Sequence, residues 1–225
     1  MAAESAADEV KAGMIVGLGT GSTAVFATQA LGQRVQEEGL DITGIPTSRH
    51  TEELAKGVGI KLTSLDEHAQ IDLTIDGADE VEQGPLNLIK GYGGALLREK
   101  IVASATRRLI IIADQSKLVE KLGTNHRVPV EVVPFGWRVT ARRLEKLGSK
   151  PELRVNPDGS PFVTDGGHYI LQCNFGAIEN PAAIAEELDH VVGVVEHGLF
   201  IRMAAEVRLG GPAGVTTLFP GKSGA

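Results

Sequence analysis

The sequence predicts an α/β protein with an open parallel sheet and a second, smaller α+β domain. In the first half of the chain, short apolar runs alternate with amphipathic helical segments, and most runs end in loops rich in Gly, Ser, Thr or Asp. This alternation is typical of strands and crossover helices around a parallel sheet. From residue 128 the order becomes strand–helix–strand–strand–helix–strand, which is ferredoxin-like. We therefore predict a Rossmann-like domain, residues 1–127 plus 199–225, and a small α+β domain, residues 128–198.

Composition narrows the classes of function. The chain has 225 residues and a formal net charge of −7, which argues against a general nucleic-acid binder. No apolar run approaches the roughly 18 residues of a membrane span, and the N-terminus lacks the pattern of a signal peptide. The histidines are scattered without zinc-ligand spacing. The single cysteine, Cys173, cannot form an intramolecular disulfide, so we expect a cytoplasmic protein.

The first expected strand, Met14–Gly17, ends in a loop of glycines and hydroxyls. Glycine lets the backbone approach an anion, and the amides at the next helix start can hold it. That helix begins near Ala24 and ends at Gly39. The loop matches neither a Walker loop nor a dinucleotide fingerprint, so a plain strand-to-helix turn is the alternative. The hydroxyls in Thr20–Thr23 favour contact with a phosphate or sugar.

Two further strands are expected at Ile42–Ile45 and Ile60–Leu65. Between them we expect a helix over about Thr51–Lys56, with Thr51 as its N-terminal cap. Ser48 and Arg49 follow the first of these strands, where they can line the same ligand edge.

The most acidic strand end follows the apolar run Ile71–Ile75. Three carboxylates surround a glycine there, in the segment Asp76–Glu80. Open α/β sheets bind their ligands outside the carboxyl ends of their strands. A second glycine loop, Lys90–Gly94, follows and is expected at the same edge.

The helix after this loop, about Ala95–Thr106, has Leu97, Ile101 and Ala105 on one stripe. Glu99 lies on the opposite side by the 3.6-residue period, and the small residues around it suggest close packing.

The strongest buried-strand signal, Leu109–Ala113, then brings Asp114–Lys117 to the edge of the sheet. Four polar strand-end loops are therefore expected on one rim.

The small domain is predicted from residues 128–198. The cap Asn180 and a proline in the first turn mark the start of its second helix. A last strand, Ala205–Leu209, is expected to rejoin the first sheet. The expected elements of the small domain are strands at Val128–Pro134, Glu152–Val155, Phe162–Thr164, His168–Asn174 and Val191–Glu196, and helices at Trp137–Leu147 and Pro181–Leu188.

These residue types suit proton transfer on carbon next to a carbonyl. Such a reaction needs a base and groups that stabilise an enediolate oxygen. Glu99 is the candidate base, Lys90 the candidate oxyanion stabiliser, and Asp76 and Asp79 can orient hydroxyls or move protons in ring opening. Each has a plain alternative: a surface ion pair for Glu99, a solvated Lys90, and turn formers or, together with Glu80, divalent-cation ligands for the aspartates. From the residues alone, the prediction ends at an anion site with convergent acid and base groups.

Four motifs together resemble the type A ribose-5-phosphate isomerase family: Gly19–Thr23, Asp76–Glu80, Lys90–Lys100 and Pro129–Pro134. They stand in the family's order and at its spacing, and the likeness covers nearly the whole chain. The resemblance implies an aldose-ketose isomerase that interconverts D-ribose 5-phosphate and D-ribulose 5-phosphate through a cis-enediolate. That reaction belongs to the non-oxidative branch of the pentose phosphate pathway.

The resemblance also implies roles for individual residues. Glu99 matches the general base, and Asp76, Asp79 and Lys90 match the other catalytic groups. No metal and no organic cofactor are implied, and the partners are a small sugar phosphate and further copies of the chain in a homodimer or homotetramer. The implied substrate-binding residues are Thr20, Gly21, Ser22, Thr23, Asp76, Gly77, Ala78, Asp79, Lys90, Gly91, Tyr92, Gly93 and Lys117.

Two competing classes remain open at this point. A non-catalytic sugar-phosphate sensor would normally be joined to a DNA-binding segment, and the sequence has no helix-turn-helix candidate. Another enzyme of the same broad fold, such as an aminosugar-phosphate deaminase or a coenzyme A transferase, would use a different chemistry. An aldolase-like Schiff base on Lys90 would be trapped by borohydride, and we expect no trapping.

Overall fold

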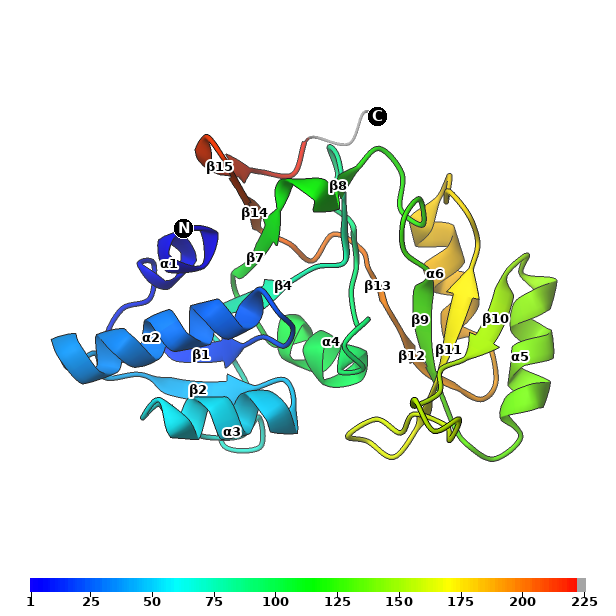
Figure 1. The fold of residues 1–225 in the computed structure, drawn as a ribbon, viewed down its shortest axis with the longest axis horizontal. Helices are drawn as coiled ribbons and strands as arrows, with labels where there is room; N and C mark the ends of the chain where they lie inside the picture. The colour runs from blue at the N-terminus through cyan, green and yellow to red at the C-terminus, as the bar shows by residue number, and fades with distance from the viewer. Residues whose placement is uncertain (222–225) are drawn as a thin grey trace.

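A computed structural model describes residues 1–221. The chain forms a large mixed sheet flanked by helices and a smaller antiparallel sheet with two helices of its own (Figure 1). Among residues 1–221, no helix is both long and apolar enough to cross a bilayer.

The large sheet has the strand order β15-β14-β7-β4-β1-β2-β3. All neighbouring strands are parallel except β14 and β15, which form an antiparallel hairpin at one edge. The expected return of the C-terminal strand is confirmed, because β14 pairs with β7. The strand bounds are β1 Ile15–Leu18, β2 Thr43–Pro46, β3 Lys61–Leu62, β4 Leu73–Gly77, β7 Leu109–Asp114, β14 Glu206–Gly211 and β15 Gly214–Leu218.

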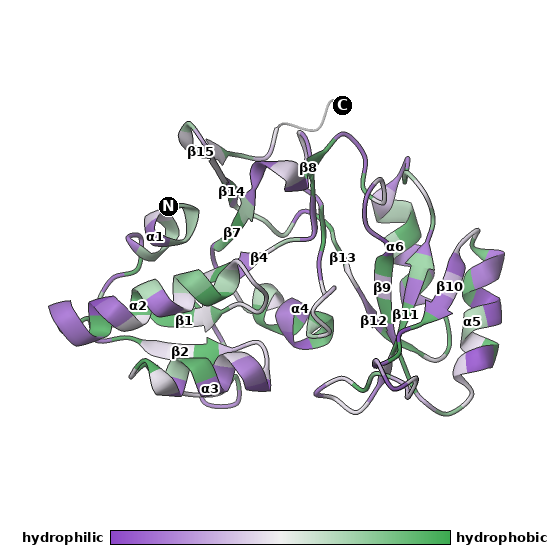
Figure 2. Ribbon diagram, in the orientation of Figure 1, coloured by the Kyte–Doolittle hydropathy of each residue, from purple (hydrophilic) through white to green (hydrophobic). Residues whose placement is uncertain are grey.

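Four helices accompany this sheet: α1 Ala2–Ala7, α2 Ala24–Glu38, α3 Arg49–Gly57 and α4 Leu96–Ser104. The helix α2 carries both hydrophilic and hydrophobic patches (Figure 2), whereas β4 and β7 are buried along almost their whole length. The α2 helix ends where Gly39 takes a left-handed backbone with φ of 70°, a conformation that glycine adopts without steric cost. The predicted stop at Gly39 is thereby confirmed.

Two local expectations are wrong. Ser48, not Thr51, caps α3: the Ser48 hydroxyl accepts a hydrogen bond from the Thr51 amide at 3.1 Å. In α4 the expected inward stripe is misplaced, because Ile101 is 46% exposed while Glu99 is buried with Leu96, Val102 and Ala103. Both faces of α4 carry apolar residues, so periodicity alone does not say which one packs against the sheet. The expected close packing around Glu99 is confirmed.

The small sheet has the order β10-β11-β9-β12 with every neighbouring pair antiparallel. This order, with two helices between the strands, is the ferredoxin-like arrangement that the sequence predicts. The expected strand Phe162–Thr164 is reduced to an isolated bridge between Val163 and Tyr169. The bounds are β9 Val128–Val132, α5 Trp137–Lys146, β10 Lys150–Leu153, β11 Tyr169–Asn174, α6 Pro181–Asp189 and β12 Val194–His197.

A third sheet of very short strands lies between the two domains and was not predicted. Its order is β13-β6-β5-β8, from β13 Leu199–Phe200, β6 Leu88–Ile89, β5 Glu80–Glu82 and β8 Leu118–Val119. Ile89 and Leu199 of this sheet share an apolar cluster with the small domain. We propose that residues 128–198 form the small domain, with the third sheet joining it to residues 1–127 and 199–221. The last four residues of the predicted bound 199–225 lie outside the described residues.

Candidate active site

The candidate site lies where the order of the large sheet reverses. From β1 the chain proceeds to β2 on one side, whereas β4 pairs with β1 on the other side and leads on toward β7. The loops that leave the ends of β1 and β4 therefore diverge and leave a crevice between them. Such a crevice at the carboxyl ends of parallel strands is the usual ligand site of an open α/β sheet.

The β1 loop approaches β4 closely because Gly19 has no side chain. A Cβ atom at Gly19 would lie 2.3 Å from the Asp76 Oδ1 atom and 2.6 Å from the Asp76 Cα atom. This contact lets the Thr20 amide donate a hydrogen bond to Asp76 Oδ1 at 3.1 Å, and the Gly77 amide donates to the same oxygen at 2.7 Å. Two backbone amides thus fix one oxygen of the Asp76 carboxylate.

The Lys90 ammonium lies at the centre of the site, and its side chain is 2% exposed. Its Nζ atom lies 2.9 Å from Asp76 Oδ2 and donates to the Gly77 carbonyl at 2.6 Å. Glu99 Oε2 lies farther away, at 3.5 Å. Burial alone would lower the pKa of Lys90, but the carboxylates of Asp76 and Glu99 outweigh burial and raise it. Lys90 therefore carries its positive charge inside the protein.

Glu99 reaches this ammonium from the buried face of α4. Within residues 1–221, its Oε2 atom has no hydrogen-bond donor, although the atom is buried. Burial raises the pKa of Glu99 from 4.5 to about 8; Lys90 opposes that rise, and the charges of Asp76 and Asp79 add to it. A carboxylate with a pKa near neutrality and an unoccupied oxygen can both take up and release a proton at physiological pH.

The charges around Lys90 do not balance. One ammonium faces the carboxylates of Asp76, Asp79 and Glu99, so the site retains a proton near neutral pH. Burial also raises the pKa of Asp76, while Lys90 opposes that rise. We assign the retained proton to Glu99, because the oxygens of Asp76 accept two amide hydrogen bonds and contact Lys90 at a shorter distance.

Asp79 holds the second glycine loop in place. The Tyr92 amide donates to Asp79 Oδ2 at 2.9 Å. Gly91 has a φ of +95°, and a Cβ atom there would lie 2.3 Å from the Cβ of Leu96. The loop therefore requires glycine at this position to pack on the start of α4.

The Thr20 hydroxyl of the β1 loop has its hydrogen-bond partners within the protein. The Thr20 hydroxyl is turned into the protein, where its Oγ1 lies 2.6 Å from Thr47 Oγ1, 2.8 Å from Ser48 Oγ and 3.0 Å from Thr51 Oγ1. The Thr20 amide also donates to Asp76, so both the hydroxyl and the amide of Thr20 are already hydrogen-bonded within the protein. Ser48 lines an adjacent hollow together with residues of the β1 loop.

One cavity unites nearly all the residues that the sequence singled out. Asp76 does not line it, but its carboxylate contacts Lys90, which does. The lining residues are Thr20, Gly21, Ser22, Thr23, Gly77, Ala78, Asp79, Lys90, Gly91, Tyr92, Gly93, Glu99 and Lys117. The alternatives of a surface Glu99 and a solvated Lys90 are wrong, because their side chains are only 3% and 2% exposed.

Glu80 lies outside this cavity. Its buried carboxylate accepts hydrogen bonds from the amides of Gly123, Asn125 and His126 at 2.5 to 2.7 Å. The carboxylate therefore fixes the loop before β9, and the predicted alternative of a cation bound jointly by Glu80 and the two aspartates does not fit its position.

A segment of the small domain borders the site and was missed in the sequence. Arg154 donates to the Tyr92 carbonyl at 2.6 Å and stacks over the Phe162 ring at 4.0 Å. Asp165 accepts from the Arg49 amide at 2.8 Å, at the first residue of α3. These residues follow the glycine loop by 60 positions or more, and no motif in the sequence marks them.

An open α/β sheet with a buried carboxylate, a lysine and two glycine loops at its crevice defines a proton-transfer enzyme. A sequence model described as Ribose 5-phosphate isomerase A (phosphoriboisomerase A) matches residues 43–214. The ribose-5-phosphate isomerase A of Synechococcus sp. (strain JA-3-3Ab) is 58% identical over 96% of this chain and 94% of its own length. That of Gluconobacter oxydans is 56% identical over 95% and 93%.

Solved structures agree with these sequence relatives. Ribose 5-phosphate isomerase A from Methanocaldococcus jannaschii has a TM-score of 0.93 and 41% identity, covering 97% of this chain and 96% of that one. A D-ribose-5-phosphate isomerase in complex with phospho-erythronic acid has a TM-score of 0.94 and 38% identity at the same coverage. The chain belongs to the ribose 5-phosphate isomerase A family.

Proposed function

We propose that this chain interconverts D-ribose 5-phosphate and D-ribulose 5-phosphate by proton transfer between neighbouring carbons. Its membership of the isomerase family supports this reaction. The observation that carries the assignment of residues is the position of Glu99, a buried carboxylate with a raised pKa, 3.5 Å from the Lys90 ammonium. Membership of this family favours the isomerase over the sensor, deaminase and transferase alternatives.

Glu99 acts as the base in this proposal. In its ionised form it takes the proton from C2 of the open-chain aldose, and the electron pair moves toward the carbonyl oxygen on C1. In the resulting cis-enediolate the hydroxyl proton on the C2 oxygen moves to the C1 oxygen. Glu99 then returns its proton to C1, which leaves the ketose carbonyl at C2. A single carboxylate can serve both carbons because a pKa near the working pH favours uptake and release equally.

Lys90 stabilises the negative charge that develops on the enediolate oxygens. Its ammonium is already held by Asp76 and the Gly77 carbonyl, so it needs no reorganisation when the charge appears. Asp76 keeps the ammonium in place and, with Asp79, is proposed to move protons between oxygens during ring opening.

The two glycine loops are proposed to bind the phosphate and the sugar hydroxyls. Gly21, Ser22 and Thr23 stand just before α2, where backbone amides and the helix dipole favour an anion. Lys117 lines the same cavity from the segment after β7 and supplies a positive charge. The segments Gly77–Asp79 and Gly91–Gly93 form the remaining wall.

We propose that the reaction needs neither a metal nor an organic cofactor. The Lys90 ammonium lies between Asp76 and Glu99, where a cation would otherwise bridge the two carboxylates. Glu80 is committed to three backbone amides.

Turnover in deuterium oxide tests the function. Purified protein is incubated with ribose 5-phosphate and EDTA, and formation of ribulose 5-phosphate and of C–D bonds is followed by NMR. We expect the ketose to form with EDTA present and with some deuterium incorporated. Incorporation below one deuterium per turnover agrees with a shielded base that returns its own proton. Binding without turnover would refute the proposed reaction.

The variant Glu99→Gln tests the base. Removal of the proton carrier should lower kcat by about 10²- to 10⁴-fold, while substrate binding changes little because the shape is kept. The matched control is Glu145→Gln, a substitution at an exposed position of α5. Full activity of the Glu99 variant would remove this residue from the mechanism.

We further propose a homodimer or homotetramer in the cytoplasm. Exposed apolar side chains support an assembly surface on the small domain: Phe135 is 94% exposed, and Val139 and Val192 are also exposed. Light scattering coupled to size exclusion measures the molar mass, and a monomer at micromolar concentration would contradict the assembly.

A further inference from the structure

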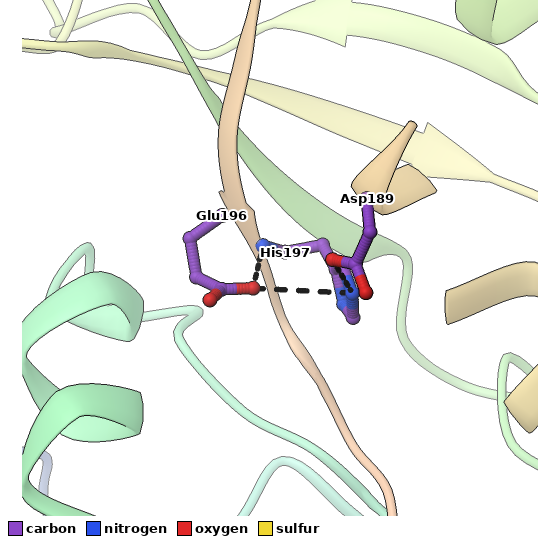
Figure 3. A group of neighbouring side chains, drawn as sticks. All are labelled: Asp189, Glu196 and His197. Atoms are coloured by element: carbon purple, nitrogen blue, oxygen red, sulfur yellow. Dashed lines mark hydrogen bonds and ion pairs between the residues drawn. The ribbon is translucent and has the colours of Figure 1, made fainter. Parts of the chain in front are cut away.

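Three side chains of the small domain form a cluster with the donor types of a metal site. Asp189 at the end of α6 and Glu196 and His197 in β12 point toward one another (Figure 3), with candidate ligand atoms within 4.8 Å. The hydrogen bonds in the cluster indicate a different role. The Lys100 ammonium donates to Glu196 Oε1 at 2.6 Å and also lies 3.3 Å from His197 Nδ1.

The tautomer of His197 follows from its neighbours. The Leu199 amide donates to Nδ1 at 3.2 Å, so Nδ1 is an acceptor. Nε2 therefore carries the proton and donates it to Asp189 Oδ1 at 3.1 Å. Burial lowers the pKa of His197 to about 3, which keeps the ring neutral. Both ring nitrogens already have hydrogen-bond partners. The Lys100 ammonium occupies the position beside Glu196 that a metal ion would need.

Lys100 follows Glu99 directly in α4, and its side chain is only 15% exposed. Glu99 faces the Lys90 ammonium, while Lys100 extends to β12 of the small domain. The ion pair between Lys100 and Glu196 therefore ties the helix that carries the proposed base to the other domain.

The segment Glu196–Phe200 also contacts Lys90. The Lys90 amide donates to the Gly198 carbonyl at 2.9 Å. A Cβ atom at Gly198 would lie 2.3 Å from the Lys90 carbonyl oxygen, so the two backbones are in close contact. The Phe200 ring lies 5.4 Å from the Lys90 Nζ atom and 5.0 Å from the Lys100 Nζ atom. One buried aromatic ring thus contacts both ammonium groups.

We propose that Lys100 is a positioning residue, which fixes α4 against the segment Glu196–Phe200 and thereby sets the distance between Glu99 and Lys90. The inference rests on the proposed function of Glu99 and Lys90. Proton transfer is sensitive to such distances, because displacement of a catalytic group by about 1 Å can cost on the order of 100-fold in rate. The supporting contacts lie outside the substrate cavity, so substrate binding depends on them less.

The test compares Lys100→Met and Lys100→Arg with the control Lys61→Met, which breaks an exposed ion pair with Asp41. We expect Lys100→Met to lower kcat by about 10- to 100-fold with a smaller change in KM. Lys100→Arg should recover part of that loss, because it keeps the charge beside Glu196. The control should keep both constants. Unchanged kcat in folded Lys100→Met would overturn the inference.

A second readout separates positioning from a general loss of structure. The groups that face Glu99 are Lys90, Asp76 and Asp79. If Lys100→Met loosens the Glu99–Lys90 contact, Lys90 opposes the raised pKa of Glu99 less, and the acid limb of the kcat profile moves to higher pH. A fall in kcat that only follows the folded fraction, with an unmoved limb, would refute positioning.

Two additional variants and one additional measurement complete the test. If Lys100→Met fails to fold, Glu196→Gln and Phe200→Leu weaken the same contacts from the other side and should lower kcat in the same direction. The pKa of Glu99 is also measured by carboxyl carbon-13 NMR without substrate. Wild-type protein that does not turn over would refute the proposed function, whereas active wild type with an unmoved Glu99 pKa in every variant would refute only the positioning role.

Discussion

Replacement of Glu99 by Gln should stabilise the fold at alkaline pH while it removes activity. The folded state holds the Glu99 proton up to a pKa of about 8, whereas the unfolded chain releases it near 4.5. Between these values the folded state binds more protons than the unfolded state, so the free energy of unfolding falls as pH rises through this window. Glutamine cannot ionise, so the Glu99→Gln variant does not lose this part of its free energy of unfolding as pH rises.

The structure gives a ceiling for the effect. The difference between a pKa of 4.5 and one of about 8 corresponds to about 5 kcal/mol. Buried sites respond with an effective dielectric constant well above that of dry protein, so we expect a gain of about 2 kcal/mol or more at pH 8.5. At pH 5 Glu99 is protonated in the folded state and resembles glutamine in shape and charge, so the two proteins should differ little.

Urea denaturation of both proteins at half-unit steps from pH 5 to 9 measures this difference. The gap should widen up to pH 8 and then level off. The exposed control Glu145→Gln should show a gap that does not follow this course. A constant difference between Glu99→Gln and wild type across the range would refute the raised pKa and, with it, the reasoning that makes Glu99 a base near neutrality.

Three further substitutions test the scaffold around the site. Glu80→Gln should lower the free energy of unfolding by about 1–3 kcal/mol, since an amide group would face a backbone donor, yet leave kcat of the folded protein unchanged; denaturation and kinetics check this. Gly19→Ala should cost about 1–3 kcal/mol from overpacking and also reduce kcat, because its Cβ would displace Asp76; retention of both properties would contradict the close contact. Arg154→Met should raise KM more than it lowers kcat, because it removes the hydrogen bond to the Tyr92 carbonyl in the second glycine loop. An unchanged KM would show that substrate binding does not depend on this contact with the small domain.

The sequence predicts the rim of the large sheet well because the relevant signals are local. A buried strand followed by glycines and hydroxyls is readable within a dozen residues, and β1, β4 and β7 lie within a few residues of their expected positions. The ferredoxin-like order of the small domain is also correct, since its strands and helices are long enough to show their periods.

The missed features depend on contacts between distant segments. Strands of two or three residues, such as β5 and β6, are too short to show a period. The direction of Glu80 follows from the loop it binds more than 40 residues later. Glu99 illustrates the boundary between the two kinds of information: its small neighbours indicated close packing, but its contact with Lys90 depends on how α4 docks.

The excess of carboxylates over ammonium groups explains both the reactivity of Glu99 and the loss of folding stability at alkaline pH. One ammonium lies among three carboxylates. The Gly77 carbonyl and Asp76 contact the Lys90 ammonium closely, whereas Glu99 lies at the longer distance of 3.5 Å. A shorter contact with Lys90 would stabilise the ionised Glu99, lower its pKa and weaken it as a base. A position without Lys90 would leave the developing enediolate charge unopposed. The observed distance lies between these extremes, and the anchoring of α4 through Lys100 is what we expect to maintain it.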